Sequence, residues 1–238
     1  MVILSTGCLY FFGLERAFKI AKLSQFEGIE LMLRPPGTEG FWDTWDNDYL
    51  QYLQEKNDLK IVTLHNHFKF EEDPTGMTDV VNLAEKLRVN NIVMHIPRAG
   101  QEIYKRWFDD YFKNKVSGKI HCLIENMGGK ALIKDPIIWN RFSDFCFDTT
   151  HSLRAGENPL ELISQMSNIR EIHISDFHDG KTHSNPLNNK LLFDKILSIN
   201  KKFIKCLEVR PEVLGSPDDQ ETIINNLITL RKYLKKFD

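Results

Sequence analysis

The chain has 238 residues, of which 42% are hydrophobic and 27% are charged, and its formal net charge is −2. This length is enough for one large domain or two small ones, with a sizeable core. The near balance of charge excludes bulk attraction to nucleic acid or to an anionic membrane, and leaves only a local basic patch as an alternative. The uncharged start, MVILSTGCLYFFGL, is too short to span a bilayer and lacks a basic leader, so it is interpreted as a first strand.

Short apolar segments alternate with amphipathic segments along the whole chain. The predicted strands are residues 2–11, 28–34, 60–68, 91–97, 119–127, 143–151, 170–177 and 202–210. The predicted helices include residues 14–26, 77–89, 158–167 and 220–237, and residues 191–199 must form the helix before the last strand. Strands that alternate with helices predict a parallel sheet. Eight such units fit a single (β/α)8 TIM barrel, whose typical size is roughly 250 residues.

The alternative architecture is a doubly wound open sheet. No Gly-rich phosphate fingerprint follows any strand, which argues against that fold and against a nucleotide cofactor. No Pro/Gly/Ser-rich linker divides the chain, so residues 1–238 are expected to form one domain. The four cysteines stand alone without a CxxC pair, which favours buried thiols in a reducing cytoplasm.

Ionisable side chains gather at the C-terminal ends of the predicted strands. In a (β/α)8 barrel these ends meet at one mouth, where active sites form. The residues concerned are Glu30, Arg34, His65, His67, His95, Glu125, Asn126, Asp148, His151, His173, Asp176, Glu208 and Arg210. Burying so many ionisable groups is costly, and a divalent metal ion is the simplest compensation. Period-two alternation places His121 one layer deeper than Glu125, so His121 is interpreted as structural.

Four motifs support a more specific interpretation. They are IEN (124–126), DTTHSLRAGENPLELI (148–163), EIHISDFHDGKTH (171–183) and LEV (207–209). In order and spacing they resemble the xylose isomerase-like barrel superfamily, which holds sugar isomerases, epimerases and endonuclease IV. The resemblance covers nearly the whole chain.

The resemblance implies a metal site and a reaction. Glu125, Asp148, His173 and Glu208 fall on the four ligands of the family's single-metal isomerase site. Such a donor set suits Mn²⁺ or Zn²⁺, with Mg²⁺ and Co²⁺ as alternatives. Glu125 and Glu208 would transfer the proton next to the carbonyl of a small sugar or sugar phosphate.

The same resemblance implies which residues hold the substrate. His151 and Arg210 would bind its oxygens, with His183, Glu30, Arg34 and His67 as further candidates. Trp42, in the Trp-rich loop 34–48, would cover the sugar, pack against the barrel rim or support a homodimer. The alternative for Arg210 is a salt bridge to Glu208 or Glu212.

Two alternatives stay open. An endonuclease IV-like zinc phosphodiesterase acting on abasic DNA would use His65 and His95 for a second metal, and His151 with His183 for a third. Lys181 stands where that third metal needs an aspartate, unless Asp176 or Asp179 substitutes, and few basic residues lie in the mouth loops. The other alternative is a sugar-binding barrel without turnover. A sugar-like partner is therefore expected, and neither nucleic acid nor a membrane.

Overall fold

The structure is a computed structural model, and it describes residues 1–33, 46–66, 74–95, 112, 118–126, 144–199 and 202–238. Eight parallel strands close into a barrel in the order β1-β10-β7-β6-β5-β4-β3-β2. The strands are β1 (Val2–Ser5), β2 (Ile29–Leu33), β3 (Ile61–Asn66), β4 (Asn91–His95), β5 (His121–Glu125), β6 (Phe145–Asp148), β7 (Ile169–Ile174) and β10 (Ile204–Leu207). The predicted (β/α)8 TIM barrel is thus confirmed.

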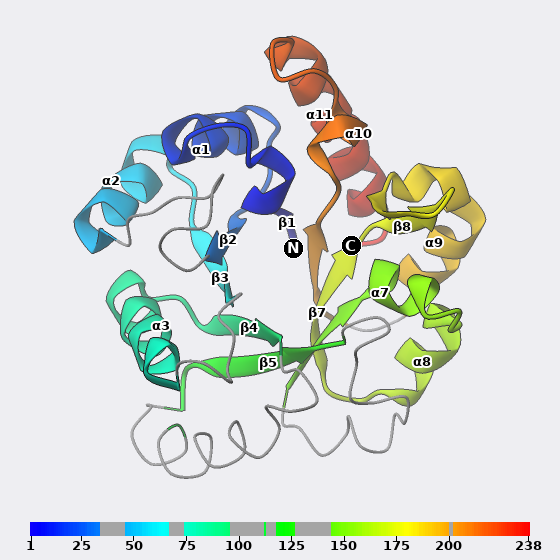
Figure 1. Ribbon diagram of the computed structural model, residues 1–238, viewed down its shortest axis with the longest axis horizontal. Helices are drawn as coiled ribbons and strands as arrows, with labels where there is room; N and C mark the ends of the chain where they lie inside the picture. The colour runs from blue at the N-terminus through cyan, green and yellow to red at the C-terminus, as the bar shows by residue number, and fades with distance from the viewer. Residues whose placement is uncertain (34–45, 67–73, 96–111, 113–117, 127–143, 200–201) are drawn as a thin grey trace.

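Helices surround the ring of strands, as Figure 1 shows. They are α1 (Leu14–Leu23), α2 (Asn47–Asn57), α3 (Pro74–Leu87), α7 (Thr149–Arg154), α8 (Pro159–Gln165), α9 (Lys190–Leu197), α10 (Pro211–Leu214) and α11 (Gln220–Lys235). The predicted helix at 191–199 corresponds to α9. None of the helices within the described residues is both long and apolar enough to cross a membrane.

The main core lies between the helices and the outer face of the barrel. On α11, the buried residues Ile223, Leu227, Leu230 and Leu234 recur at helical spacing and form one apolar face. The strands are buried on both sides, so their outward side chains complete this core. A separate small cluster, formed by Val93, Leu123 and Cys146, lies apart from it. All four cysteines are buried and free of disulfides.

The strands are shorter than the sequence predicts, because local side-chain bonds end them. The Ser5 side chain accepts from the Gly7 amide and starts the 3-10 helix Thr6–Leu9 within the predicted first strand. Asp148 does the same after β6, where its carboxylate accepts from the His151 amide at 2.6 Å and caps α7. The sequence predicts His151 at the end of a strand, but this residue lies on α7. Such side-chain bonds compete with the sheet ladder wherever Ser, Thr or Asp ends a strand.

A hairpin after β7 was not predicted. It consists of β8 (Asp176–His178) and β9 (Lys181–Ser184), joined through Asp179 and Gly180. Both turn residues have positive φ, 49° and 72°, which is the conformation that an Asp-Gly turn favours. The hairpin brings His183 back towards the barrel mouth.

Candidate functional site

His173 lies at the centre of the candidate site. It is fully buried on β7, and its Nδ1 atom lies 2.8 Å from a carboxylate oxygen of Glu125 and 2.8 Å from one of Glu208. The nearest oxygen of Asp148 is 3.9 Å from the same nitrogen. The structure therefore brings together the four side chains that the sequence predicts as metal ligands.

These four side chains share a second property. Each has a buried polar atom that makes no hydrogen bond of ordinary geometry among the described residues, although it lies within ion-pair distance of another side chain of the site; these atoms are Glu125 Oε2, Asp148 Oδ2, His173 Nδ1 and Glu208 Oε2. Buried polar atoms are normally hydrogen-bonded, since leaving one without a partner costs about 1–3 kcal/mol. Three carboxylate oxygens and one imidazole nitrogen form a donor set that suits a divalent cation. The residues present thus fit a bound metal ion.

The electrostatics of the four side chains agree with that fit. Burial raises the pKa of Asp148, and the charges of the neighbouring His151 and His183 oppose this shift only in part. Burial would also raise the pKa of Glu125, but the nearby imidazoles of His95 and His173 hold it well below its usual value. The negative charge of Glu125 is therefore maintained by the positive charge of its neighbours, and a bound cation would do the same for Asp148.

His65 and His95 form a second group beside Glu125. Their Nε2 atoms are 3.0 Å apart, and the Nε2 of His65 lies 3.2 Å from Glu125 Oε2. The Nε2 of His95 contacts the same oxygen. The three side chains could hold a metal ion together, with Glu125 shared between this group and the first. The sequence predicts His65 and His95 as ligands of a second metal only in the endonuclease IV-like alternative, and the structure brings both rings beside Glu125.

A third group consists of Asp148, His151 and His183, whose candidate ligand atoms lie within 4.8 Å of one another. Two contacts hold the His183 ring in place: its Nδ1 lies 3.3 Å from Ser175 Oγ and 3.2 Å from the carbonyl oxygen of Glu208. Both rings are partly exposed. They can therefore meet a substrate at the mouth.

Lys181 stands two residues before His183 on β9, and its side chain is exposed. Asp176 and Asp179 are the candidates to replace the aspartate that is missing at position 181, and neither belongs to the third group. Asp179 is exposed and pairs with His178 at 3.4 Å, and Asp176 accepts a hydrogen bond from the Phe177 amide. The carboxylate of the third group is supplied by Asp148.

Hydrogen bonds that the motifs did not reveal hold the strand ends in place. Asn126 exchanges two hydrogen bonds with the Asp148 backbone, at 2.6 and 2.8 Å. The Thr149 hydroxyl lies 2.9 Å from the His173 carbonyl oxygen and 2.7 Å from that of Ser175. The Thr150 hydroxyl accepts from the His183 amide at 3.0 Å. The sequence signal for these bonds is the Asp-Thr-Thr-His run itself, which links β6 to β7 and to the hairpin.

The remaining candidates are placed differently. Arg210 is exposed and donates to the Thr182 hydroxyl at 3.0 Å, and within the described residues it makes no ion pair with Glu208 or Glu212. Glu30 is fully buried and faces His65 and His173. His121 contacts Asp144 at 3.0 Å at the start of β5, as a structural histidine would. Arg34, Trp42 and His67 lie outside the described residues.

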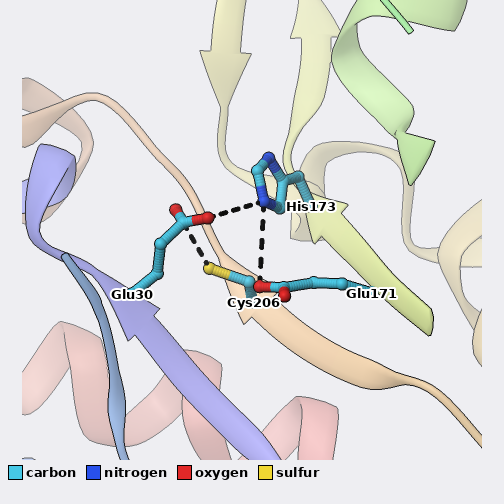
Figure 2. Close-up of side chains that lie close together, drawn as sticks. All are labelled: Glu30, Glu171, His173 and Cys206. Atoms are coloured by element: carbon cyan, nitrogen blue, oxygen red, sulfur yellow. Dashed lines mark hydrogen bonds and ion pairs between the residues drawn. The ribbon is translucent and has the colours of Figure 1, made fainter. Parts of the chain in front are cut away.

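Figure 2 shows a group of side chains on the Nε2 side of His173, which contains Glu30, Glu171 and Cys206. Glu171 stands two residues before His173 on β7, so strand alternation places both on the inner face of the barrel. Burial and the charge of Glu30 raise the pKa of Glu171 to about 8. Sequence reasoning missed Glu171, although its spacing from His173 was a usable signal.

Comparisons with known proteins identify the class of fold. No family model and no curated protein sequence matches the chain. A xylose isomerase domain-containing protein from Salmonella typhimurium matches with a TM-score of 0.75 and 16% identity, over 98% of this chain and 97% of that one. The 3-keto-D-glucoside 4-epimerase of E. coli matches with a TM-score of 0.69 and 14% identity, over 97% and 98%. The probable 3-DHS dehydratase from Bacillus anthracis matches with a TM-score of 0.64 and 14% identity, over 97% and 98%.

The matches run over nearly the full length of each chain. They show that this protein has the same barrel fold as these three proteins. At identities of 14–16% they establish the fold alone. The reaction must therefore be argued from the side chains at the mouth.

Proposed function

We propose that this protein is a divalent-metal-dependent isomerase or epimerase that acts on a small sugar, sugar phosphate or similar hydroxycarbonyl compound. The observation that carries the proposal is the convergence of three buried carboxylates on one buried imidazole, with oxygens of Glu125, Asp148 and Glu208 all within 3.9 Å of His173 Nδ1. Some structural matches, among them an epimerase and a sugar phosphate isomerase/epimerase, support the same class of reaction.

Glu125, Asp148, His173 and Glu208 would hold the metal ion. When bound, a divalent ion polarises the carbonyl and hydroxyl oxygens of such a substrate and makes the hydrogen on the carbon beside them more acidic. Mn²⁺ and Zn²⁺ both suit a donor set of carboxylates and one imidazole, and Mg²⁺ and Co²⁺ are alternatives.

The chain's own residues would move the proton. Glu125 and Glu208 both approach His173 Nδ1, from β5 and from the end of β10. One carboxylate takes the proton from carbon and the other returns it to a different carbon or to the opposite face. The Glu208 side chain is 10% exposed and that of Glu125 1%, so Glu208 is the better placed of the two to meet a substrate from the mouth.

Other residues would orient the substrate. His151 and His183 lie at the mouth with their ring centroids 5.7 Å apart, and both can bond a sugar hydroxyl. Arg210 lies further out on the rim, where it can reach a phosphate or a hydroxyl group. Their positions suit recognition, while the buried carboxylates suit proton transfer.

The test is solvent exchange into carbon. The protein loaded with Mn²⁺ would be incubated in D2O with a panel of ketoses, aldoses and their phosphates, and NMR would follow loss of a carbon-bound proton. We expect exchange with at least one compound, its loss in Glu208→Gln, and no change in the matched surface variant Glu221→Gln. Full exchange activity in Glu208→Gln would refute the two-glutamate mechanism, and binding without exchange would favour the sugar-binding barrel.

One observation favours a second candidate function, a zinc phosphodiesterase of the endonuclease IV type. His65 and His95 lie together beside Glu125, and His151 and His183 lie beside Asp148, so two further groups next to the proposed site could hold metal ions. Two or more zinc ions per chain, with nicking of abasic DNA, would make this candidate the leading one. The exposed Lys181 and the acidic net charge make it the second choice.

A further inference from the structure

Glu30 occupies a central and unexplained position in the barrel. It is fully buried on β2, and its Oε2 accepts a hydrogen bond from His173 Nε2 at 3.0 Å. Its other oxygen, Oε1, lies 3.3 Å from His65 Nδ1. One carboxylate thus contacts two imidazoles from two different strands.

The opposite nitrogen of each ring faces a candidate metal group. Nδ1 of His173 lies 2.8 Å from Glu125 and from Glu208, and Nε2 of His65 lies 3.0 Å from Nε2 of His95. A neutral imidazole that binds a metal through one nitrogen carries its proton on the other nitrogen. A carboxylate beside that second nitrogen holds the proton there and fixes the orientation of the ring.

We propose that Glu30 is a positioning residue that sets the proton position on both rings at once. It holds the proton of His173 on Nε2 and the proton of His65 on Nδ1, which leaves His173 Nδ1 and His65 Nε2 to accept a metal ion. This role differs from a substrate contact, and it suits a side chain that is completely buried beside two imidazole rings. The His173 half of the inference rests on the proposed metal-dependent function, and the His65 half rests on an additional ion at His65 and His95. Together they explain how two parts of the centre are aligned by one side chain.

The neighbouring side chains support this assignment. Glu171 is the other carboxylate near His173 Nε2, but its Oε1 is 3.9 Å away and its Oε2 accepts from the Thr63 hydroxyl at 2.7 Å (Figure 2). The Cys206 thiol lies 3.6 Å from Glu30 Oε1, where it acts as a weak donor to the carboxylate. Glu30 therefore makes the hydrogen bond to His173, and Glu171 provides a matched control.

The substitution Glu30→Gln should affect the rings of His65 and His173 differently. A carboxylate accepts on both oxygens, whereas an amide has one accepting oxygen and one donating nitrogen. In Glu30→Gln the amide oxygen takes the shorter contact, to His173 Nε2, so the amide NH2 group faces His65 Nδ1. That nitrogen must then accept, the His65 proton moves to Nε2, and His65 can no longer bind a metal.

The experiment is ¹⁵N NMR of the histidine rings in the Zn²⁺-loaded protein, together with zinc stoichiometry and affinity from competition with a chelator. In Glu30→Gln we expect the His65 proton on Nε2, an unchanged His173 ring, and an affinity about 10- to 100-fold weaker at the His65–His95 position. Glu30→Asp keeps the carboxylate and should keep both wild-type proton positions. Glu171→Gln should leave both rings and the zinc affinity unchanged.

Unchanged ring signals and unchanged affinity in folded Glu30→Gln would overturn the inference, as would an equal effect of Glu171→Gln. If the wild-type protein takes up none of Zn²⁺, Mn²⁺, Mg²⁺ and Co²⁺, the proposed function fails first. The ring signals of the metal-free protein then test separately whether Glu30 holds the His173 proton on Nε2. Glu30→Ala shifts the His173 Nε2 proton signal if the contact exists, and leaves it in place if it does not.

Discussion

Replacing Thr149 with valine should destabilise the protein through one buried hydroxyl. Thr149 is fully buried, and its Oγ1 lies 2.9 and 2.7 Å from the carbonyl oxygens of His173 and Ser175. The same oxygen accepts from the Ser175 amide at 3.1 Å. Valine has nearly the same shape, so the substitution removes these bonds without leaving a large cavity.

The expected magnitude follows from the groups left without a partner. The Ser175 amide is buried and loses its acceptor, which costs about 1–3 kcal/mol. We therefore expect the free energy of unfolding to fall by about 2 kcal/mol. For a domain of this size, that corresponds to a decrease in Tm of about 4–8 °C.

Urea denaturation in the presence of EDTA would measure this effect, since the chelator removes any contribution from bound metal. Thr229→Val is the matched control, because the Thr229 hydroxyl also bonds a carbonyl, that of Asn225 at 2.9 Å, but on the exposed face of α11. The control should change stability by less than about 0.5 kcal/mol. A Thr149→Val variant as stable as the control would refute the view that this hydroxyl ties β6 to β7.

Three further predictions concern the metal, the helix cap and the pH dependence. Adding Mn²⁺ to the EDTA-treated protein at about 100 times its Kd should stabilise it by about 2.7 kcal/mol and raise Tm by about 5–10 °C in scanning fluorimetry; no shift with any of the four metals would contradict the site. Asp148→Asn should abolish that shift yet leave the metal-free protein as stable as wild type, because asparagine caps a helix as well as aspartate does, whereas Asp148→Ala should lose about 1 kcal/mol. Burial would raise the pKa of Asp238, but Lys205 and Lys235 lower it, so its contribution is present at neutral pH and is lost as the pH falls below about 4. Asp238→Asn should therefore be less stable than wild type at pH 7, by less than about 1 kcal/mol, and denaturation curves should converge in acid.

The sequence predicts the barrel well because its signal is repeated. Each of the eight strands is an apolar run, and each side of a parallel barrel strand is buried, so hydrophobicity alone locates the strands. The ends of the strands were harder to place. Ser5 and Asp148 both start a helical turn with their own side chains, a competition between local bonds that an apolar pattern does not report.

The site residues were found by type and order, but their contacts depend on register. Glu30 ends up level with Thr63 on β3 and with Ser5 on β1, so it lies under the rings of His65 and His173 and not at the surface of the mouth. The stagger between strands decides this, and no single strand contains that information. The same limit applies to the hairpin, although the Asp179-Gly180 pair was a recognisable turn signal.

The contact between His65 and His95 bears most directly on the choice between the two candidate functions. Two imidazole nitrogens 3.0 Å apart need either at least one N–H at their contact or a cation bound to both, because two lone pairs repel each other. In the first case a ring donates to the other ring or to Glu125 Oε2, and a single metal ion at His173 serves an isomerase. In the second case both rings are ligands, and the site holds at least two ions. Metal content by plasma mass spectrometry separates these cases: His95→Ala leaves the stoichiometry unchanged in the first and lowers it by one ion in the second.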